Sequence, residues 1–266
     1  ANWSGVANID WEAWKPAFLA NRYNEYWIYI NRSEALVAKT HPDWPADKVA
    51  KQAEADFNKA SQEYWTASLR LCKKLRPNGV WGWYNYPIDS WNATFTGLGW
   101  LYDEVTALFP SIYLTTTNAT LNRQYVDIAL NKTKRVRDLH RKGGTRALPT
   151  YAFVWLDYDM PPFPKSTAGL LSPEDVQTEL VRGATRWALD GVILWGSSID
   201  ARNATYCAGS YTTYVDQVAG PALLEAAKAA DECAAARCSS RGKCCGEWDG
   251  CECDVGYGGR DCSSFV

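Results

Sequence analysis

Apolar residues occur along this chain in two patterns, short continuous runs and longer stretches with helical spacing. The first run begins with Gly5-Val6-Ala7 and ends at a pair of carboxylates, Asp10 and Glu12. The other runs lie at 80–84, 110–114, 147–154 and 192–196, and all have the pattern of strands buried on both faces. The helically spaced stretches predict helices over 43–75, 97–108, 121–141, 172–190 and 213–231. Residues 14–30 are expected to form loop and a short helix. Strand and helix therefore alternate, which predicts a parallel α/β fold.

Two parallel architectures fit this order of elements. One is an open, doubly wound sheet, but no glycine-rich phosphate loop follows any predicted strand, so nucleotide binding has little support. The other is a β/α barrel, in which the active site forms at the C-terminal ends of the strands. The residues expected at those ends are Asp10, Glu12, Tyr84, Tyr113, Tyr151 and Trp195.

Two carboxylates, Asp10 and Glu12, follow the first apolar run. On an extended chain, residues two apart point to the same face, so the two side chains are expected to project together. Two close carboxylates do not both ionise easily, and one of them then holds a proton near neutral pH, as a general acid must. A solvated pair at the end of a strand is the alternative.

Composition narrows the class of partner. The chain of 266 residues has a net charge of −2, which argues against nucleic acid. Its 14 Trp and 15 Tyr suit either core packing or a groove in which sugar faces stack on aromatic rings. No run of 18 apolar residues exists, so no segment is expected to span a membrane.

Glycosylation sequons and cysteines indicate the secretory pathway. The six Asn-x-Ser/Thr acceptors are Asn2, Asn31, Asn92, Asn118, Asn131 and Asn203. The expected location is therefore secreted or lysosomal. Because no signal peptide is visible, we expect a further segment upstream.

The composition changes near Cys233, since seven of the nine cysteines lie between 233 and 262. Residues 251–262 resemble the end of an EGF-like module, and a segment this short needs disulfides to stay folded. The expected domains are a barrel-type domain, 1–231, and an EGF-like module, 232–266. Zinc is the alternative for such a cluster, but the cluster contains no His, so we expect no metal and no cofactor.

Several motifs, in this order along nearly the whole chain, resemble the animal hyaluronidases. They are Ile9-Asp10-Trp11-Glu12-Ala13-Trp14-Lys15-Pro16, His41-Pro42-Asp43-Trp44-Pro45, Trp81-Gly82-Trp83-Tyr84-Asn85-Tyr86-Pro87, Pro110-Ser111-Ile112-Tyr113 and Gly191-Val192-Ile193-Leu194-Trp195-Gly196-Ser197-Ser198. The resemblance implies a distorted β/α barrel, incomplete here because its first β/α units are missing. It also implies cleavage of hyaluronan, and of chondroitin as a second substrate.

The resemblance assigns roles to the candidate residues. Glu12 matches the family's acid/base and Asp10 its carboxylate partner, in a mechanism in which the substrate's own acetamido group attacks C1 and the configuration is retained. Tyr113 is expected to hold that acetamido group. The expected groove residues are Tyr84, Tyr151, Trp195 and Asp89. The implied disulfides are Cys233–Cys244, Cys238–Cys251 and Cys253–Cys262, with Cys245 as an alternative to Cys244.

The chain also departs from the family pattern. Ala129 stands where the family usually has an Arg that can meet a glucuronate carboxylate, which favours a second hypothesis of a catalytically weak, glycosaminoglycan-binding relative. Under that hypothesis, restoring Arg raises activity. A third hypothesis is a matrix or adhesion protein that binds through its EGF-like module. Cys207 is expected to pair upstream, Cys72 to be a buried free thiol, and the sequence predicts no oligomeric state.

Overall fold

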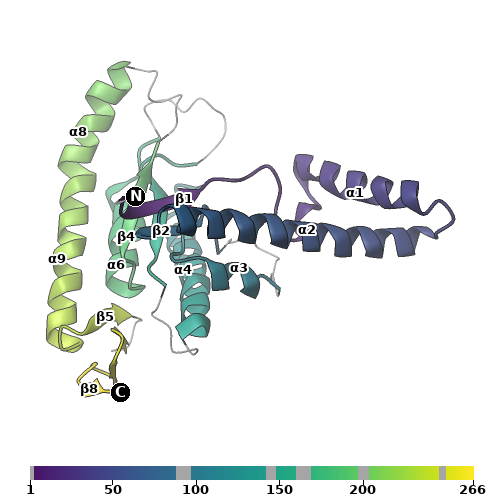
Figure 1. Ribbon diagram of the computed structural model, residues 1–266. Helices are drawn as coiled ribbons and strands as arrows, with labels where there is room; N and C mark the ends of the chain where they lie inside the picture. Colours follow the sequence, from purple (N-terminus) through teal and green to yellow (C-terminus); the bar gives the residue numbers. More distant parts are fainter. Residues whose placement is uncertain (1–2, 88–96, 142–147, 160–168, 197–203, 246–249) are drawn as a thin grey trace. The chain divides into compact units, whose positions relative to one another are not determined.

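The computed structural model describes residues 3–87, 97–141, 148–159, 169–196, 204–245 and 250–266 (Figure 1). These residues form two compact units. The first contains the described parts of Ala1–Tyr84 and Ser90–Thr106, and the second those of Asn85–Asp89 and Ala107–Val266. We describe each unit by itself.

The first unit pairs two parallel strands and adds a long helical hairpin. Strand β1 (Gly5–Ile9) runs beside β2 (Gly79–Trp83), with Ile9 opposite Trp83. Its helices are α1 (Trp27–Thr40), α2 (Ala46–Leu75) and α3 (Gly99–Glu104), with short 3₁₀ turns η1 (Phe18–Asn21) and η2 (Asn24–Tyr26) before α1. Helices α1 and α2 lie side by side (Figure 1).

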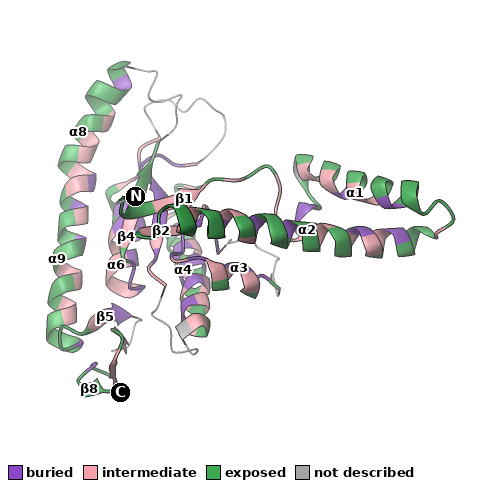
Figure 2. Ribbon diagram, in the orientation of Figure 1, coloured by how far each residue is buried: buried purple, intermediate pink, exposed green. Residues whose placement is uncertain are grey.

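Burial along this hairpin follows one stripe, while most of each helix surface is exposed (Figure 2). The buried side chains between α1 and α2 are Phe18, Ile30, Val37, Val49 and Ala53. Towards the strands, the fully buried Trp65 of α2 packs on Trp83 of β2, with ring centroids 4.0 Å apart. This contact fixes the C-terminal end of β2 against α2.

The second unit contains a parallel sheet segment covered by helices. Strands β3 (Tyr151–Trp155) and β4 (Gly191–Trp195) are paired, and the extended residues 107–112 run parallel to β3 on its other edge. The covering helices are α4 (Ala119–Arg141), α5 (Pro173–Val176), the π-helical η3 (Gln177–Val181) and α6 (Arg182–Arg186). They are followed by η4 (Tyr206–Tyr211), α8 (Thr212–Tyr214), η5 (Val215–Ala219) and α9 (Gly220–Arg237).

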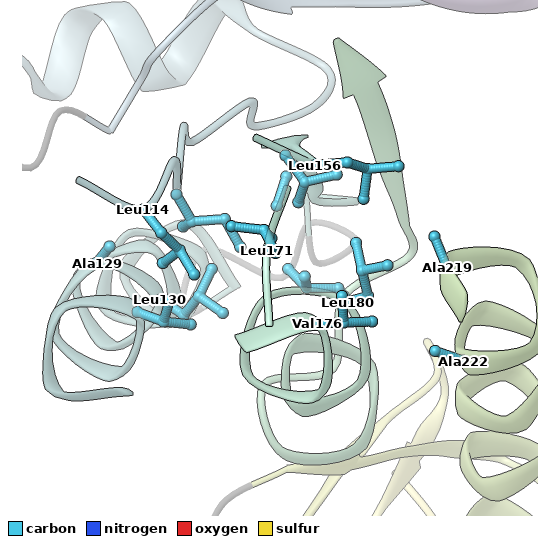
Figure 3. Close-up of a cluster of buried hydrophobic side chains, with 14 of the residues drawn as sticks. Leu114, Ala129, Leu130, Leu156, Leu171, Val176, Leu180, Ala219 and Ala222 are labelled. Atoms are coloured by element: carbon cyan, nitrogen blue, oxygen red, sulfur yellow. The ribbon is translucent and has the colours of Figure 1, made fainter. Parts of the chain in front are cut away.

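One apolar cluster holds these layers together (Figure 3). Leu156, just after β3, belongs to a cluster that also contains side chains of α4, η3, η5 and α9. Ala129 and Leu130 of α4 belong to the same cluster and are 3% and 1% exposed. The position that the resemblance aligns with the family's Arg is therefore inside this apolar cluster in the structure.

The C-terminal segment is cross-linked and attached to the helices of its unit. Its strands are β5 (Gly242–Cys245), β6 (Gly250–Cys253), β7 (Tyr257–Gly258) and β8 (Ser264–Phe265), which form two antiparallel pairs. The disulfides are Cys233–Cys244, Cys238–Cys251 and Cys253–Cys262, the pairs that the resemblance implies. Cys233 lies in α9, so the domain boundary proposed at 231/232 falls inside a continuous helix.

Several element predictions need correction. Helix α1 covers 27–40, and only 27–30 of it lie in the stretch predicted to form loop and a short helix. Helix α3 is shorter than the predicted 97–108. Residues 110–114 make single bridges rather than a regular strand. Tyr151 begins its strand instead of ending it. Among the described residues, no helix is both long and apolar enough to cross a membrane.

Candidate active site

A carboxylate pair lies at the C-terminal edge of the β1–β2 sheet in the first unit. Asp10 and Glu12 follow β1, and Tyr84 follows β2. The Tyr84 amide donates a hydrogen bond of 3.0 Å to the Ile9 carbonyl, so parallel pairing continues to this edge. Asp10 and Glu12 are exposed, and Tyr84 is half-buried. Solvent and a ligand can therefore reach both carboxyl groups.

The surroundings of Glu12 favour its protonated form. Partial burial raises the pKa of Glu12, the neighbouring charge of Asp10 raises it further, and the Lys15 ammonium opposes both effects. The pKa of Lys15 is itself lowered by burial, although the charges of Glu12, Asp10 and Glu25 act in the other direction. A carboxylic acid that keeps its proton to higher pH is suited to protonate a leaving group.

The loop after Glu12 is fixed by a buried amide. The Asn21 side chain is fully buried, and its Oδ1 accepts a hydrogen bond of 2.8 Å from the Lys15 amide. Its Nδ2 donates to the carbonyls of Lys15, Ala17 and Phe18 at 3.0, 3.0 and 3.3 Å. These bonds hold the chain segment that carries Lys15.

The aromatic neighbours of the pair pack against α2. Trp11 contacts Tyr64, with ring centroids 5.5 Å apart, and Trp14 contacts Phe57, Tyr64 and Trp65 at 5.6, 5.6 and 5.9 Å. These tryptophans contribute to packing and place the carboxylate segment on α2.

Three aromatic rings in the second unit form what we call the aromatic platform: Tyr113, Trp155 and Trp195. Trp155 and Trp195 end β3 and β4, and their ring centroids are 4.8 Å apart in a T-shaped contact. The Tyr113 ring lies 5.8 Å from each of them. Trp155 is buried, whereas Trp195 is 41% exposed, so the platform presents an accessible apolar face. Such a face can stack on a sugar ring.

The sequence predicted Tyr113 and Trp195 as site residues, and it missed Trp155. The structure brings Tyr113 and Trp195 together but places Tyr151 at the start of β3, opposite Gly191. A Cβ at Gly191 would lie 3.2 Å from the Tyr151 ring, which shows that this ring packs on the first residue of β4. Tyr151 is thus wrongly assigned to the C-terminal ends of the strands.

The other predicted residues fall into two groups. The glycosylation acceptors Asn31, Asn118 and Asn131 are exposed. Residues outside the described part of the chain are Asp89, Asn2, Asn92 and Asn203. In the part that the structure describes, no group of three or more His, Cys, Asp or Glu side chains could hold a metal ion.

Three cysteines of the described chain form no disulfide. Cys72 is half-buried rather than fully buried as expected, Cys207 is exposed, and Cys245 is buried. Burial raises the pKa of the Cys72 and Cys245 thiols, so neither of them is activated as a nucleophile.

Comparison with known proteins identifies the family. A family model described as hyaluronidase matches residues 1–250. The chain belongs to the hyaluronidase family. It is 36% identical to Hyaluronidase-1 of Sus scrofa over 262 residues, covering 92% of this chain and 58% of that protein. It is 32% identical to Hyaluronidase-2 of Mus musculus over 261 residues, covering 90% and 53%.

The chain spans a little over half the length of the curated relatives it matches. Among solved structures it is similar to bee venom hyaluronidase, with a TM-score of 0.71 and 26% identity, covering 82% of this chain and 71% of that one. Bee venom hyaluronidase in complex with a hyaluronic acid tetramer matches with a TM-score of 0.73 and 27% identity, covering 84% and 70%. Both the family and the distorted β/α-barrel fold class predicted from the sequence are confirmed.

Proposed function

We propose that the complete protein is a secreted or lysosomal hyaluronidase that cleaves β-1,4 linkages of hyaluronan and of chondroitin. The observation that carries this proposal is Glu12, an accessible acid at the ends of two parallel strands whose pKa is raised by burial and by Asp10. The likeness to a hyaluronidase described in complex with a hyaluronic acid tetramer supports a glycosaminoglycan substrate.

In the proposed mechanism, Glu12 acts first as acid and then as base. Its proton goes to the glycosidic oxygen as the C1–O bond breaks, while the acetamido oxygen of the same N-acetylhexosamine bonds to C1. Water then adds to C1 of the resulting oxazolinium ion as the bond between C1 and the acetamido oxygen breaks, and Glu12 takes up the proton from that water. The configuration at C1 is retained because C1 is attacked twice. Asp10 orients the acetamido group and keeps the proton on Glu12.

The remaining residues are proposed to bind substrate. Tyr113 hydrogen-bonds the acetamido group and holds it in line with C1, which is a positioning contribution. Trp195 offers its exposed ring for stacking on a sugar. Tyr84 lies at the same edge of the β1–β2 sheet as Asp10 and offers its hydroxyl group as a hydrogen-bonding partner. Asp89 stays a proposal from the family resemblance.

The test compares Glu12→Gln with wild type in the complete protein, with hyaluronan and unsulfated chondroitin as substrates. We expect Glu12→Gln to lose cleavage, measured as new reducing ends, and to keep polymer binding, measured by sedimentation or calorimetry. Glu63→Gln, at an exposed carboxylate on α2, is the matched control and keeps activity. Cleavage that survives Glu12→Gln would rule out the proposed function.

Two other hypotheses compete with this proposal. The case for a catalytically weak relative depended on Ala129, which packs in the core cluster. An adhesion role for the cysteine-rich segment cannot be tested by deleting 233–266, because this deletion removes the end of α9 and the Cys233–Cys244 bridge. Exposed point substitutions such as Val255→Glu and Phe265→Glu test it instead, and they should leave hyaluronan binding unchanged.

A further inference from the structure

A fully buried carboxyl group lies directly behind the aromatic platform. Glu179, in η3, is 0% exposed. Its Oε1 accepts a hydrogen bond of 3.3 Å from the backbone amide of Trp155, the last residue of β3. Its Oε2 has no hydrogen-bond partner among the described residues. Glu179 is therefore the acceptor that ends the hydrogen bonding of β3 at the platform.

Other acidic and phenolic groups occupy the same buried region. Asp157 follows β3 and accepts from the Tyr206 hydroxyl at 2.7 Å, and Asp175 of α5 accepts from Asn122 Nδ2 at 2.9 Å and from the Tyr158 hydroxyl. Tyr214 of α8 is close enough for Glu179, Asp157 and Asp175 to affect its pKa.

These neighbours favour the neutral form of Glu179. Asp175 receives several side-chain donors, whereas Glu179 receives one backbone N–H. Burial raises the pKa of Glu179 well above its ordinary value, the Trp155 amide opposes this effect, and the charge of Asp175 adds to it. A carboxyl group that is buried without a cation partner is expected to stay protonated.

We propose that Glu179 is a positioning residue for the substrate-binding face: as a neutral acid it holds the Trp155 backbone and so fixes the ring against which Tyr113 and Trp195 pack. The geometry consists of one hydrogen bond to the Trp155 amide and two ring contacts of 5.8 and 4.8 Å from the Trp155 indole. The expected effect of Glu179 on substrate binding rests on the proposed function, whereas its expected effect on the aromatic platform does not.

The first test separates the neutral acceptor from the charge. Glu179→Gln keeps a neutral acceptor of the same shape, and Glu179→Leu removes it. In the complete protein we expect the Glu179→Gln variant to retain the near-ultraviolet circular dichroism signal of the Trp155–Trp195 pair. The Glu179→Leu variant should lose part of that signal. With hyaluronan oligosaccharides, Leu should raise KM roughly threefold to tenfold, as expected for one misplaced aromatic contact, and change kcat less.

The second test measures how the circular dichroism signal of the platform depends on pH. A side chain that only packed in the core would not affect that dependence. A group whose pKa is raised by folding contributes stability below its unfolded pKa and loses it as the pH rises through its folded pKa. The wild-type platform signal should therefore fall as the pH rises through the raised pKa of Glu179, and Glu179→Gln should extend the upper pH limit of that signal. Glu174→Gln, an exposed carboxylate on α5, is the control and should leave that limit unchanged.

The outcomes are distinct. The proposal is overturned if Glu179→Gln loses the platform signal as Glu179→Leu does, or if the wild-type protein and Glu179→Gln share one upper pH limit. If the wild-type protein neither binds nor cleaves hyaluronan, the proposed function fails, and the circular dichroism arm still decides the role of Glu179.

Discussion

Replacing Asn21 tests whether the loop after the carboxylate pair depends on one buried amide. Asn21→Leu keeps a side chain of similar size and removes all its hydrogen bonds. The Asn21 Oδ1 accepts one backbone N–H, and the two protons of Nδ2 are shared among three carbonyls. At most three good hydrogen bonds are therefore lost.

The magnitude follows from that count. A hydrogen bond contributes about 1 kcal/mol net, and a buried donor left without a partner costs about 1–3 kcal/mol. We expect Asn21→Leu to lower the free energy of unfolding by about 3 kcal/mol, which corresponds to roughly 6–12 °C in Tm. Asn21→Asp keeps the acceptor for Lys15 but turns an oxygen towards the three carbonyls. At pH 7, Asn21→Asp should lower the free energy of unfolding more than Asn21→Leu does. Part of this loss should be recovered when acidification protonates the new carboxyl group.

Urea unfolding of the complete protein, followed by tryptophan fluorescence at pH 7 and pH 4, measures these differences. Gln62→Leu, on the exposed face of α2, is the control and should change stability by less than about 0.5 kcal/mol. If Asn21→Asp were as stable as wild type at pH 7, the amide could not be a donor to the three carbonyls. The account of how the loop is held would then be wrong.

Three further predictions concern charged side chains. Ala129→Arg should cost about 3 kcal/mol or more, because it overfills the core cluster and buries an unpaired guanidinium, and a zymogram should show no gain in hyaluronan cleavage. Glu252→Gln removes the carboxylate 3.0 Å from the buried Arg137, and urea unfolding should show a loss of about 3 kcal/mol. Asp10→Asn removes a charge that raises the pKa of Glu12, so the alkaline limb of the residual pH–rate profile should move to lower pH; an unchanged limb would contradict the coupling.

Elements whose limits are set by local chemistry could be predicted from the sequence. Helix α2 begins after Pro45, close to the predicted start at Asp43, and ends just before Pro77-Asn78-Gly79. Helix α1 was largely missed because it depends on a distant segment. Its buried residues Ile30 and Val37 pack with residues of α2, and this contact is not visible in a short sequence window.

Strand ends decided which site residues could be found. Residues 110–114 read as a strand, but Pro110 has no N–H to donate, and the described contacts to β3 are single bridges rather than a ladder. The strand predicted over 147–154 covers 151–155 in the structure. This shift of a few residues moves Tyr151 to the beginning of β3 and places Trp155 at its end, which explains why Trp155 was missed.

Glu12 and Glu179 show why a raised pKa does not by itself identify a catalytic residue. Burial is the main cause in both, and a nearby Asp adds to it in both. Glu12 is exposed at a strand end, so it can exchange a proton with a bound sugar and with water. Glu179 has no exposed surface and bonds to a backbone amide, so its proton cannot reach a substrate. Accessibility therefore supports the proposed acid/base role of Glu12 and the proposed positioning role of Glu179, and the upper pH limit of the platform signal in Glu179→Gln tests this distinction.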